Sequence, residues 1–412
     1  MRQTITKGTS RRQLVAVTKK IEGALISESP DAAALCREVR NELVLGEDEA
    51  RRFLRRIVLD LNAAYFPAIN TVDLMMTDRC TLACTYCFER RMTVKHEMTA
   101  ETARAAVDFL VDYSGKAEKL YLCLFGGEPL MNFGVMQDCV AYAGKRVAAA
   151  GKKVRFDITT NGTLLTEETL DFFAAHGILP LLSVDGLAES HDSCRVDHAG
   201  NGSFARVGRA IELVFRKHNY VGVRMTVMPR NVPRFYDDIV GLHKLGVRSF
   251  LVGAAIGSDW PDDLMDFYGS ELRRVLEWRD REAPKVRLTG DFEGKASHGV
   301  FGCRAGRNAV TVSTTGEISA CATILGLNSV NLVKKLGDVE FGLTHFRHRF
   351  EFATAFRVKE NCEKCGIAAD YPGGCYANNY EETGDLYLPS LGRYRFEKIR
   401  CSHGLVQGAA TQ

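Results

Sequence analysis

The chain has 412 residues, enough for two domains or for one large domain with an appended segment. Its residues are 46% hydrophobic and 25% charged, as in an ordinary globular protein, and the formal net charge of +3 argues against a nucleic-acid coat or a strongly acidic partner. No apolar run approaches the roughly 18 residues that would suggest a membrane span. We therefore expect a cytoplasmic protein with no nucleic-acid or membrane partner.

The elements expected in chain order begin with helices over residues 1–69, where apolar residues recur at helical spacing. Six short apolar or β-branched runs then alternate with amphipathic stretches between residues 70 and 255, as expected of buried parallel strands and their connecting helices. The runs are TVDLMM (71–76), KLYLCLF (119–125), VRFDIT (154–159), LPLLSV (179–184), VGVRMTVM (221–228) and RSFLVGAA (248–255). Thr99 and Thr166 are candidate N-caps of two of the helices. The pattern predicts an α/β fold with a parallel sheet, either open and doubly wound or partly closed into a barrel.

The rest of the chain has a different composition. Residues 256–300 are charged and are expected to form a linking helix, whereas residues 301–405 are richer in Gly, Asn and Cys and only weakly periodic. Such regions are commonly held together by metal rather than by a large core. We therefore expect four parts, bounded at residues 1–69, 70–255, 256–300 and 301–405.

The thirteen cysteines are clustered, which suggests metal ligation in a reducing compartment. TDRCTLACTYCFE places Cys80, Cys84 and Cys87 in C-x3-C-x2-C spacing directly after the first expected strand. Three thiolates on one short loop can hold three irons of a cubane cluster and leave the fourth iron open for chemistry on a small molecule. A structural zinc loop is the alternative, but it would need a fourth ligand that the chain does not offer nearby.

This loop, with Tyr86 just before its last cysteine, resembles the signature of the radical S-adenosylmethionine (SAM) enzymes. The resemblance implies a partial (β/α)6 barrel and an enzyme in which SAM chelates the open iron of a [4Fe–4S] cluster. An external one-electron reductant of the flavodoxin or ferredoxin type would supply the electron. Cleavage of SAM would then yield a 5′-deoxyadenosyl radical that abstracts a substrate hydrogen.

Two later segments resemble the SAM-binding parts of the same family. LFGGEPL carries Gly126, Gly127 and Glu128, whose backbone and carboxylate would receive the SAM ammonium, although a plain tight turn is the alternative. In SVDGLAESHDSCR, Ser183 would end the fourth strand near SAM and Arg195 would bind the SAM carboxylate. The alternative for that arginine is a surface ion pair with a neighbouring aspartate, Asp192 or Asp197.

The C-terminal cysteines resemble the SPASM domain, an extension that carries two auxiliary [4Fe–4S] clusters in part of this family. By that resemblance, Cys303, Cys321 and Cys375 would hold the first auxiliary cluster. The second would be held by Cys362, Cys365 and Cys401, with Tyr371 at the position where the family has a fourth cysteine. Asp370 and His403 are close enough in sequence to substitute for the missing ligand.

Two other possibilities remain open for these cysteines. The second cluster could be absent, with its three cysteines binding zinc or nothing. No role is assigned to the four scattered cysteines, Cys36, Cys123, Cys139 and Cys194, since buried free thiols are common.

The function implied by this resemblance is oxidation or cross-linking of a peptide. The first hypothesis is a maturase of a ribosomally made peptide (RiPP) that forms a thioether or carbon–carbon link. The second is an anaerobic sulfatase-maturating enzyme that forms formylglycine, although such enzymes usually keep the cysteine replaced here by Tyr371. A radical dehydrogenase of a small molecule and a non-enzymatic iron–sulfur scaffold are further alternatives. The catalytic acid or base is not identified by the sequence.

Overall fold

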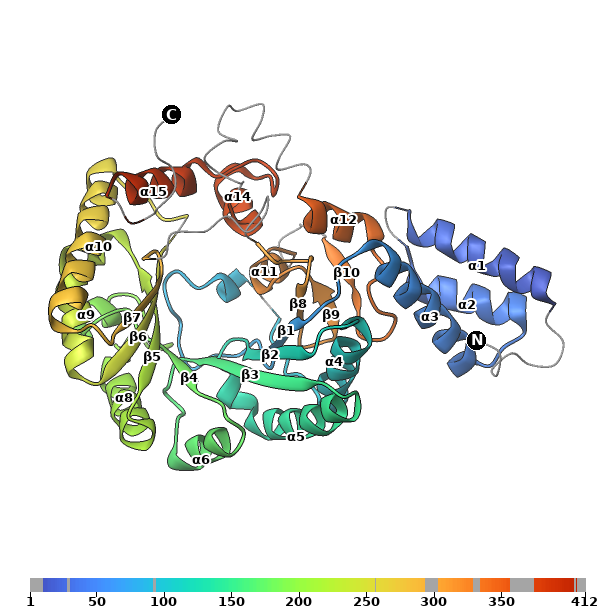
Figure 1. The fold of residues 1–412 in the computed structure, drawn as a ribbon, viewed down its shortest axis with the longest axis horizontal. Coiled ribbons are helices and arrows are strands. Elements are labelled where there is room, and N and C mark those ends of the chain that lie inside the picture. Colours follow the sequence, from blue (N-terminus) through green and yellow to red (C-terminus); the bar gives the residue numbers. More distant parts are fainter. Residues whose placement is uncertain are drawn as a thin grey trace.

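The computed structural model describes residues 10–27, 30–91, 94–255, 257–292, 303–328, 334–355, 374–403 and 405. In this part of the chain one curved sheet has helices along its outer face (Figure 1). The strands are β1 (Thr71–Met75), β2 (Lys119–Phe125), β3 (Lys153–Thr160), β4 (Pro180–Ser183), β5 (Val221–Val227), β6 (Val247–Ala254), β7 (Arg287–Gly290), β8 (Ala309–Val312), β9 (Glu317–Ser319) and β10 (Lys335–Asp338).

The helices alternate with the strands through the middle of the chain and cluster at its two ends. They are α1 (Arg11–Leu25), α2 (Ala32–Leu43), α3 (Glu47–Tyr65), α4 (Ala100–Tyr113), α5 (Phe133–Ala149), α6 (Glu167–Ala175), α7 (Ala188–Asp192), α8 (Phe204–His218), α9 (Phe235–Lys244), α10 (Asp262–Glu282), α11 (Ala322–Asn328), α12 (Phe346–Thr354), α14 (Tyr376–Thr383) and α15 (Leu391–Ser402). The described residues also form short 3-10 segments, which are η1 (Phe88–Arg91), η2 (Pro129–Asn132) and η3 (Pro229–Arg234).

The order of the strands decides between the two expected sheet types. β1 to β6 are parallel and lie side by side in their order along the chain. A doubly wound sheet reverses its strand order at a switch point, whereas a barrel keeps the order and places every helix on its outer side. The α/β fold and the partial (β/α)6 barrel are therefore confirmed, and the open doubly wound alternative is wrong.

The helix starts lie where their capping residues predicted. Thr99 precedes α4 and its side chain accepts a hydrogen bond from the amide of Thr102. Thr166 precedes α6 and accepts from the amide of Thr169 in the same way. Each cap satisfies an amide that the first helical turn leaves without a partner.

The sheet extends beyond the six expected strands at both edges. β7 adds to β6 in parallel, directly after the expected linking helix α10. At the other edge β8 pairs in parallel with β1, and β9 and β10 follow in antiparallel order. The cysteine-rich C-terminal region thus shares one sheet with the barrel.

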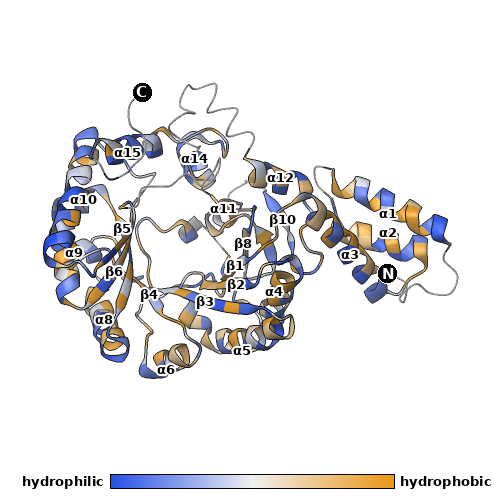
Figure 2. Cartoon of the chain, in the orientation of Figure 1, coloured by the Kyte–Doolittle hydropathy of each residue, from blue (hydrophilic) through white to orange (hydrophobic). Residues whose placement is uncertain are grey.

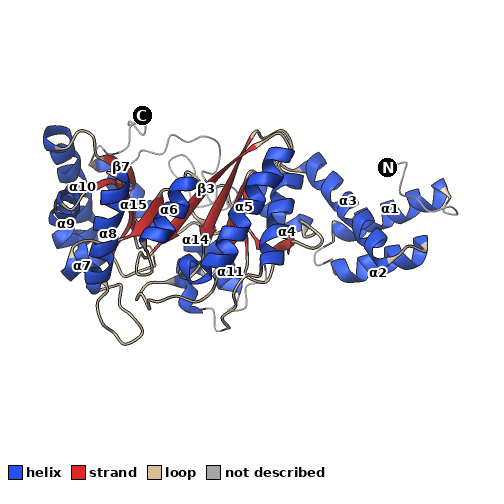
Figure 3. Ribbon diagram, turned by 90° about the horizontal axis from the view of Figure 1, so that it is seen from below, coloured by secondary structure: helices blue, strands red, loops and turns tan. Residues whose placement is uncertain are grey.

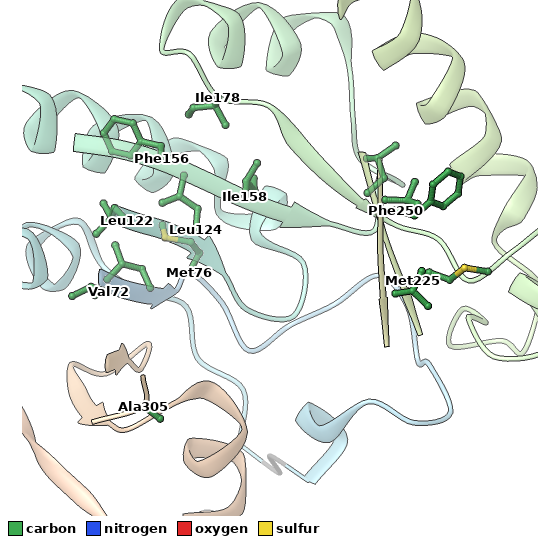
Figure 4. Close-up of a cluster of buried hydrophobic side chains, with 14 of the residues drawn as sticks. Val72, Met76, Leu122, Leu124, Phe156, Ile158, Ile178, Met225, Phe250 and Ala305 are labelled. Atoms are coloured by element: carbon green, nitrogen blue, oxygen red, sulfur yellow. The ribbon is translucent and has the colours of Figure 1, made fainter. Parts of the chain in front are cut away.

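Side chains alternate along the barrel strands, as the two-residue period of a β-strand requires. Hydrophilic and hydrophobic residues alternate along β3 (Figure 2). Leu122, Leu124, Phe156 and Ile158 belong to the buried cluster between the sheet and its helices (Figure 4). The intervening residues, such as Asp157, point to the inner side of the arc.

Helices α1 to α3 form an arm beside the barrel (Figures 1 and 3). The arm has its own buried cluster, which also includes Phe341 and Phe346 from the segment after β10. Asn62 of α3 donates a hydrogen bond to the carbonyl of Leu343 at 2.9 Å and accepts one from Arg349. These contacts fix the arm to the C-terminal region.

Candidate active site

The cysteine loop leaves the carboxyl end of β1 and is held by the glycine-glycine-glutamate segment after β2. The amide of Gly127 donates to the carbonyl of Thr77 at 2.9 Å, and the amide of Glu128 donates to the carbonyl of Arg79 at 2.8 Å. A Cβ at Gly126 would lie 2.4 Å from the Thr77 carbonyl oxygen, and one at Gly127 would lie 2.2 Å from that of Arg79. Gly126 also has a φ of +123°, which other residues rarely adopt. Both glycines are therefore needed for the close approach of the two chains.

Among the three cysteines of the loop, Cys84 is buried, whereas Cys80 and Cys87 are half-buried. The amide of Cys87 donates to the carbonyl of Cys84 at 3.2 Å. The Sγ of Cys80 accepts from the amide of Leu82 at 3.4 Å and from Nδ2 of Asn161 at 3.5 Å. Burial raises the pKa of the Cys80 thiol to about 12 and that of Cys87 to about 11. Thiolates at these positions need a nearby positive charge, which bound iron would supply.

The number of ligands in the loop suits a cluster better than a single ion. The loop offers three thiols, Cys80, Cys84 and Cys87, one fewer than the four ligands of a closed zinc site. In a cubane cluster each thiolate binds a different iron, and three thiolates leave the fourth iron open. Among the described residues, no group of three cysteine, histidine or acidic side chains is placed to hold one metal ion.

Glu128 lies beneath the loop with none of its surface exposed. Its carboxylate accepts hydrogen bonds from Oγ1 of Thr160 at 2.7 Å, the amide of Asn161 at 2.8 Å and the amide of Leu130 at 3.1 Å. Burial raises its pKa to about 7, although these donors oppose the shift. Glu128 thus joins the carboxyl ends of β2 and β3, and its contact with the SAM ammonium stays a prediction.

Arg195 is buried and paired, but with neither aspartate that the sequence suggested. Its guanidinium donates to Asp185 from Nε at 2.9 Å and from Nη2 at 3.1 Å. Asp192 instead accepts from the amide of Phe204, and Asp197 accepts from nearby backbone amides and pairs with Arg206. The alternative of a surface ion pair with Asp192 or Asp197 is wrong, because Arg195 is buried and pairs with Asp185 after the end of β4.

Asp185 organises the side chains next to the cysteine loop. It accepts from the hydroxyl of Tyr86 at 2.5 Å and from the amide of Thr226 at 2.9 Å, in addition to Arg195. The Nη1 of Arg195 lies 3.9 Å from the Sγ of Cys84, which places a permanent positive charge beside one cysteine of the loop. Sequence reasoning missed Asp185, whose only signal was its place in SVDG directly after the fourth strand.

Ser183 is the last residue of β4 and is half-buried. It lies opposite Arg224 in the β4–β5 ladder, two residues before Asp185. Tyr86, Glu128, Ser183 and Arg195 therefore all lie at the carboxyl ends of the barrel strands or on the loops that follow them. Their roles toward SAM, like those of Gly126 and Gly127, stay predictions.

A row of polar residues crosses the inner face of the sheet. It lies further from the carboxyl ends of the strands than the residues above do. Asp73 of β1 lies opposite Cys123 of β2 and Thr311 of β8, and Cys123 lies opposite Asp157 of β3. Burial raises the pKa of Asp73 to about 6, against the lowering effect of Arg304. Sequence reasoning assigned Cys123 no role and missed Asp73, whose signal was a charge inside an apolar strand.

Three C-terminal cysteines of the expected first auxiliary cluster are also close together. Burial raises the pKa of the Cys321 thiol, and the neighbouring thiols of Cys375 and Cys303 add to the effect. Cys321 follows β9, and Cys375 is the residue before α14. All three are half-buried against the main core.

The expected second auxiliary site falls largely outside the described residues. This applies to Cys362, Cys365 and Tyr371, and to the side chain of Cys401, whose backbone lies in α15. His403 is described, and its Nε2 lies 3.0 Å from Asp266 of α10.

A parallel partial barrel with a three-cysteine loop at its carboxyl edge defines a class of enzymes that use a cluster with one open iron. Residues 74–239 match the radical SAM superfamily, and this part of the chain is a radical SAM domain. Such a domain implies a [4Fe–4S] cluster and SAM, and the three thiols of the loop fit the cluster. None of the helices in the described segments combines the length and apolar character needed to cross a membrane.

Two curated proteins resemble the chain over most of its length. The subtilosin biosynthesis protein AlbA of Bacillus subtilis is 24% identical over 342 residues, covering 79% of this chain and 71% of that protein. The AdoMet-dependent heme synthase of Methanosarcina barkeri is 26% identical over 343 residues, covering 75% and 92%.

Among solved structures, anSMEcpe with bound AdoMet and a Kp18Cys peptide has a similar fold. Its TM-score is 0.62 at 21% identity, and the match covers 81% of this chain and 97% of that one.

Proposed function

We propose that this protein is a radical SAM enzyme that abstracts a hydrogen atom from a peptide, as a maturase of a ribosomally made peptide. The observation that carries the proposal is the cysteine loop clamped by Gly126, Gly127 and Glu128 at the carboxyl edge of a partial barrel. The similarity to AlbA and to the peptide-bound anSMEcpe fold, each over about four fifths of the chain, supports a peptide substrate.

With cluster and SAM bound, the chemistry supplied is reductive cleavage of SAM to a 5′-deoxyadenosyl radical by an electron from an external flavodoxin- or ferredoxin-type protein. The chain's own residues prepare the place for this chemistry. The glycine segment fixes the loop backbone, Asp185 holds Tyr86 and Arg195 against it, and Asn161 donates to Cys80. A carboxylate with buried donors around it holds its position without rearranging, which keeps such a site preorganised.

The polar row of Asp73, Cys123 and Asp157 supports the inner face of the barrel as the substrate side. Asp157 pairs with Arg155, and its side chain is 45% exposed, so this face is polar and open to solvent at β3. A peptide lying along it could exchange hydrogen bonds with these polar groups.

Auxiliary iron–sulfur clusters are part of this proposal. Cys303, Cys321 and Cys375 would hold the first in a SPASM-type region that begins at about residue 301, next to the barrel region of residues 70–255. The first is supported by the proximity of the three thiols. The second, with Cys362, Cys365 and Cys401, rests on spacing alone.

A small-molecule substrate is the second candidate, because the heme synthase also resembles most of this chain. The formylglycine-forming activity is a third, supported by the anSMEcpe fold and weakened by Tyr371 at a cysteine position.

The test is the intact mass of a co-expressed peptide. The protein would be produced with the shortest open reading frame beside its gene, and the peptide would be weighed with and without a Cys84→Ala variant as control. A loss of hydrogen mass only with the unaltered enzyme supports the maturase.

An unchanged mass, together with 5′-deoxyadenosine formed from SAM by the reduced enzyme, would move the proposal to the small-molecule or sulfatase alternative. If the reduced enzyme forms no more 5′-deoxyadenosine than the Cys84→Ala variant, the radical SAM activity itself is refuted.

A further inference from the structure

A cavity lies outside the barrel, where the arm meets the C-terminal region. Its volume is about 220 Å³, and its walls come from α3, α4 and the turn after β10. Arg52, Arg55 and Arg56 of α3 line one side, and Phe109, Tyr113 and Phe341 line the floor. We call these residues the arginine groove. Neither the cysteine loop nor the polar row contributes to it.

The groove is built by contacts that fix its walls. The hydroxyl of Tyr113 accepts from the amide of Leu343 at 3.1 Å, next to Gly342. A Cβ at Gly342 would lie 2.2 Å from that hydroxyl oxygen, so a glycine is required for the turn to pass over the tyrosine. On the other side, Arg349 donates to the carbonyl of Pro67 at 2.7 Å and holds the end of α3. The groove is therefore preformed.

The rim of the groove is cationic although the whole chain is nearly neutral. Arg56 pairs with Asp60 at 2.8 Å, and Arg55 lies 3.6 Å from Asp112, which also pairs with Arg146. Arg52 is exposed, and in the described segments no carboxylate forms an ion pair with it. Asp60 and Asp112 thus offset two of the three arginines, and the positive charge of Arg52 is left to be matched.

Size and chemistry indicate the occupant. Pockets for drug-sized ligands or cofactors usually have volumes of about 300 Å³ or more, so this one suits a side chain or two of a peptide. Its aromatic floor suits an apolar side chain, and guanidinium groups bind carboxylates with paired hydrogen bonds. The chain's own first 21 residues contain basic residues and no acidic one. This segment therefore lacks the negative charge that would pair with the arginines of the groove.

We propose that the arginine groove binds an acidic segment of the substrate peptide that lies apart from the modified residue. This inference rests on the proposed peptide maturase activity and adds a recognition site to it. Binding at the groove would tether the peptide and raise its effective concentration at the barrel. Its loss would therefore raise KM more than it lowers kcat.

The test compares two charge reversals on the arm of the full-length, cluster-loaded enzyme. Arg52→Glu reverses the groove charge, and Arg12→Glu makes the same change of net charge on the exposed start of α1. The probe is a fluorescein-labelled synthetic peptide encoded by the shortest open reading frame beside the gene, and its anisotropy gives Kd. We expect Kd to rise at least about tenfold for Arg52→Glu, and to change less than about twofold for Arg12→Glu, since the lost contact is charge-assisted.

A second experiment uses the same peptide with its Asp and Glu residues replaced by Asn and Gln. We expect this neutral peptide to compete poorly with the labelled one. The proposal that the groove binds the peptide would be overturned by equal affinity of the two variants, by full competition from the neutral peptide, or by no binding to the unaltered enzyme. SAM cleavage without peptide, measured as 5′-deoxyadenosine, reports on the radical SAM activity separately and should be the same in both variants.

Discussion

At the scale of single residues, the buried charges beside the cysteine loop centre on Asp185. Its two oxygens accept hydrogen bonds from Arg195, Tyr86 and the amide of Thr226. The side chains of both ion-pair partners are at most 9% exposed, so neither can be solvated alone. Removing one charge from such a pair typically costs about 3–5 kcal/mol, because the other charge is left buried.

Asp185→Asn should therefore destabilise the protein by about 3–5 kcal/mol, as measured by urea unfolding. Asp197→Asn is the matched control, because this aspartate pairs with Arg206 at a more exposed place, where water can stabilise the charge that remains, so we expect a smaller loss of stability. A similar decrease in the free energy of unfolding in the two variants would contradict the organising role of Asp185.

Asp73 predicts a pH dependence of stability. Burial raises its pKa in the folded state to about 6, above the unfolded value of about 3.9. The folded state then binds more protons between these values, so its stability falls as the pH rises through this window and is constant above it. Between pH 5 and pH 8, wild type should lose about 1 kcal/mol more than Asp73→Asn, as urea unfolding at several pH values would show. If the stabilities of the two proteins change with pH in the same way, the raised pKa of Asp73 is refuted.

The cysteine loop could be predicted from the sequence because its three ligands lie within eight residues. The partner of Arg195 could not, because Asp185 reaches it only through the turn after β4 and the path of α7. Spacing favoured Asp192 and Asp197 as neighbours, but sequence distance does not give the direction of a side chain. The same limit hid the row of Asp73 and Cys123, which only the strand register aligns.

At the scale of elements, the loop depends on two backbone segments in contact. Gly127→Ala should push the Arg79 carbonyl away, since the new Cβ would lie 2.2 Å from it. We expect the purified protein to lose at least about half of the iron bound at this loop. The measurement is iron per chain in a background that lacks the cysteines of both proposed auxiliary clusters, which are Cys303, Cys321, Cys362, Cys365, Cys375 and Cys401. The large steric conflict is with backbone, which cannot move as a side chain can.

Gly144→Ala is the control for this change. Gly144 lies inside α5 and a Cβ there meets nothing within 4 Å, so alanine should keep the iron and stabilise the helix by up to about 1 kcal/mol. Equal iron content in the Gly127 and Gly144 variants would contradict the clamp.

The six barrel strands could be predicted because each run alternates with an amphipathic helical stretch, whereas β8, which lies in a weakly periodic region, could not. Its four residues, AVTV, resemble many short loops, and its partner β1 lies more than two hundred residues earlier. β7 was missed for a similar reason, as RLTG carries no apolar run. Pairing, rather than local propensity, makes strands of both.

At the scale of the whole molecule, the sheet binds the radical SAM domain to the C-terminal region. A chain ending at Phe292 would lack β8 and leave the edge of β1 unpaired, with buried residues such as Val310 and Val312 no longer covering it. We expect this truncated chain to aggregate, because an unpaired apolar strand edge pairs with other chains. The soluble fraction after expression is the measurement.

Full-length protein with Cys303, Cys321 and Cys375 changed to serine separates the strand from any metal. It keeps β8 and should remain mostly soluble. If it aggregates as fully as the truncated chain, metal binding rather than strand pairing is what the barrel requires.

The pairing of β1 with β8 also sets an order of events during synthesis. The ribosome completes β1 and its cysteine loop long before β8 emerges. One edge of β1 therefore stays unpaired during most of synthesis. A nascent chain at that stage has a thiol-rich loop on an unfinished sheet. We expect stable delivery of iron to this loop only after β8 has left the ribosome and paired with the open edge of β1.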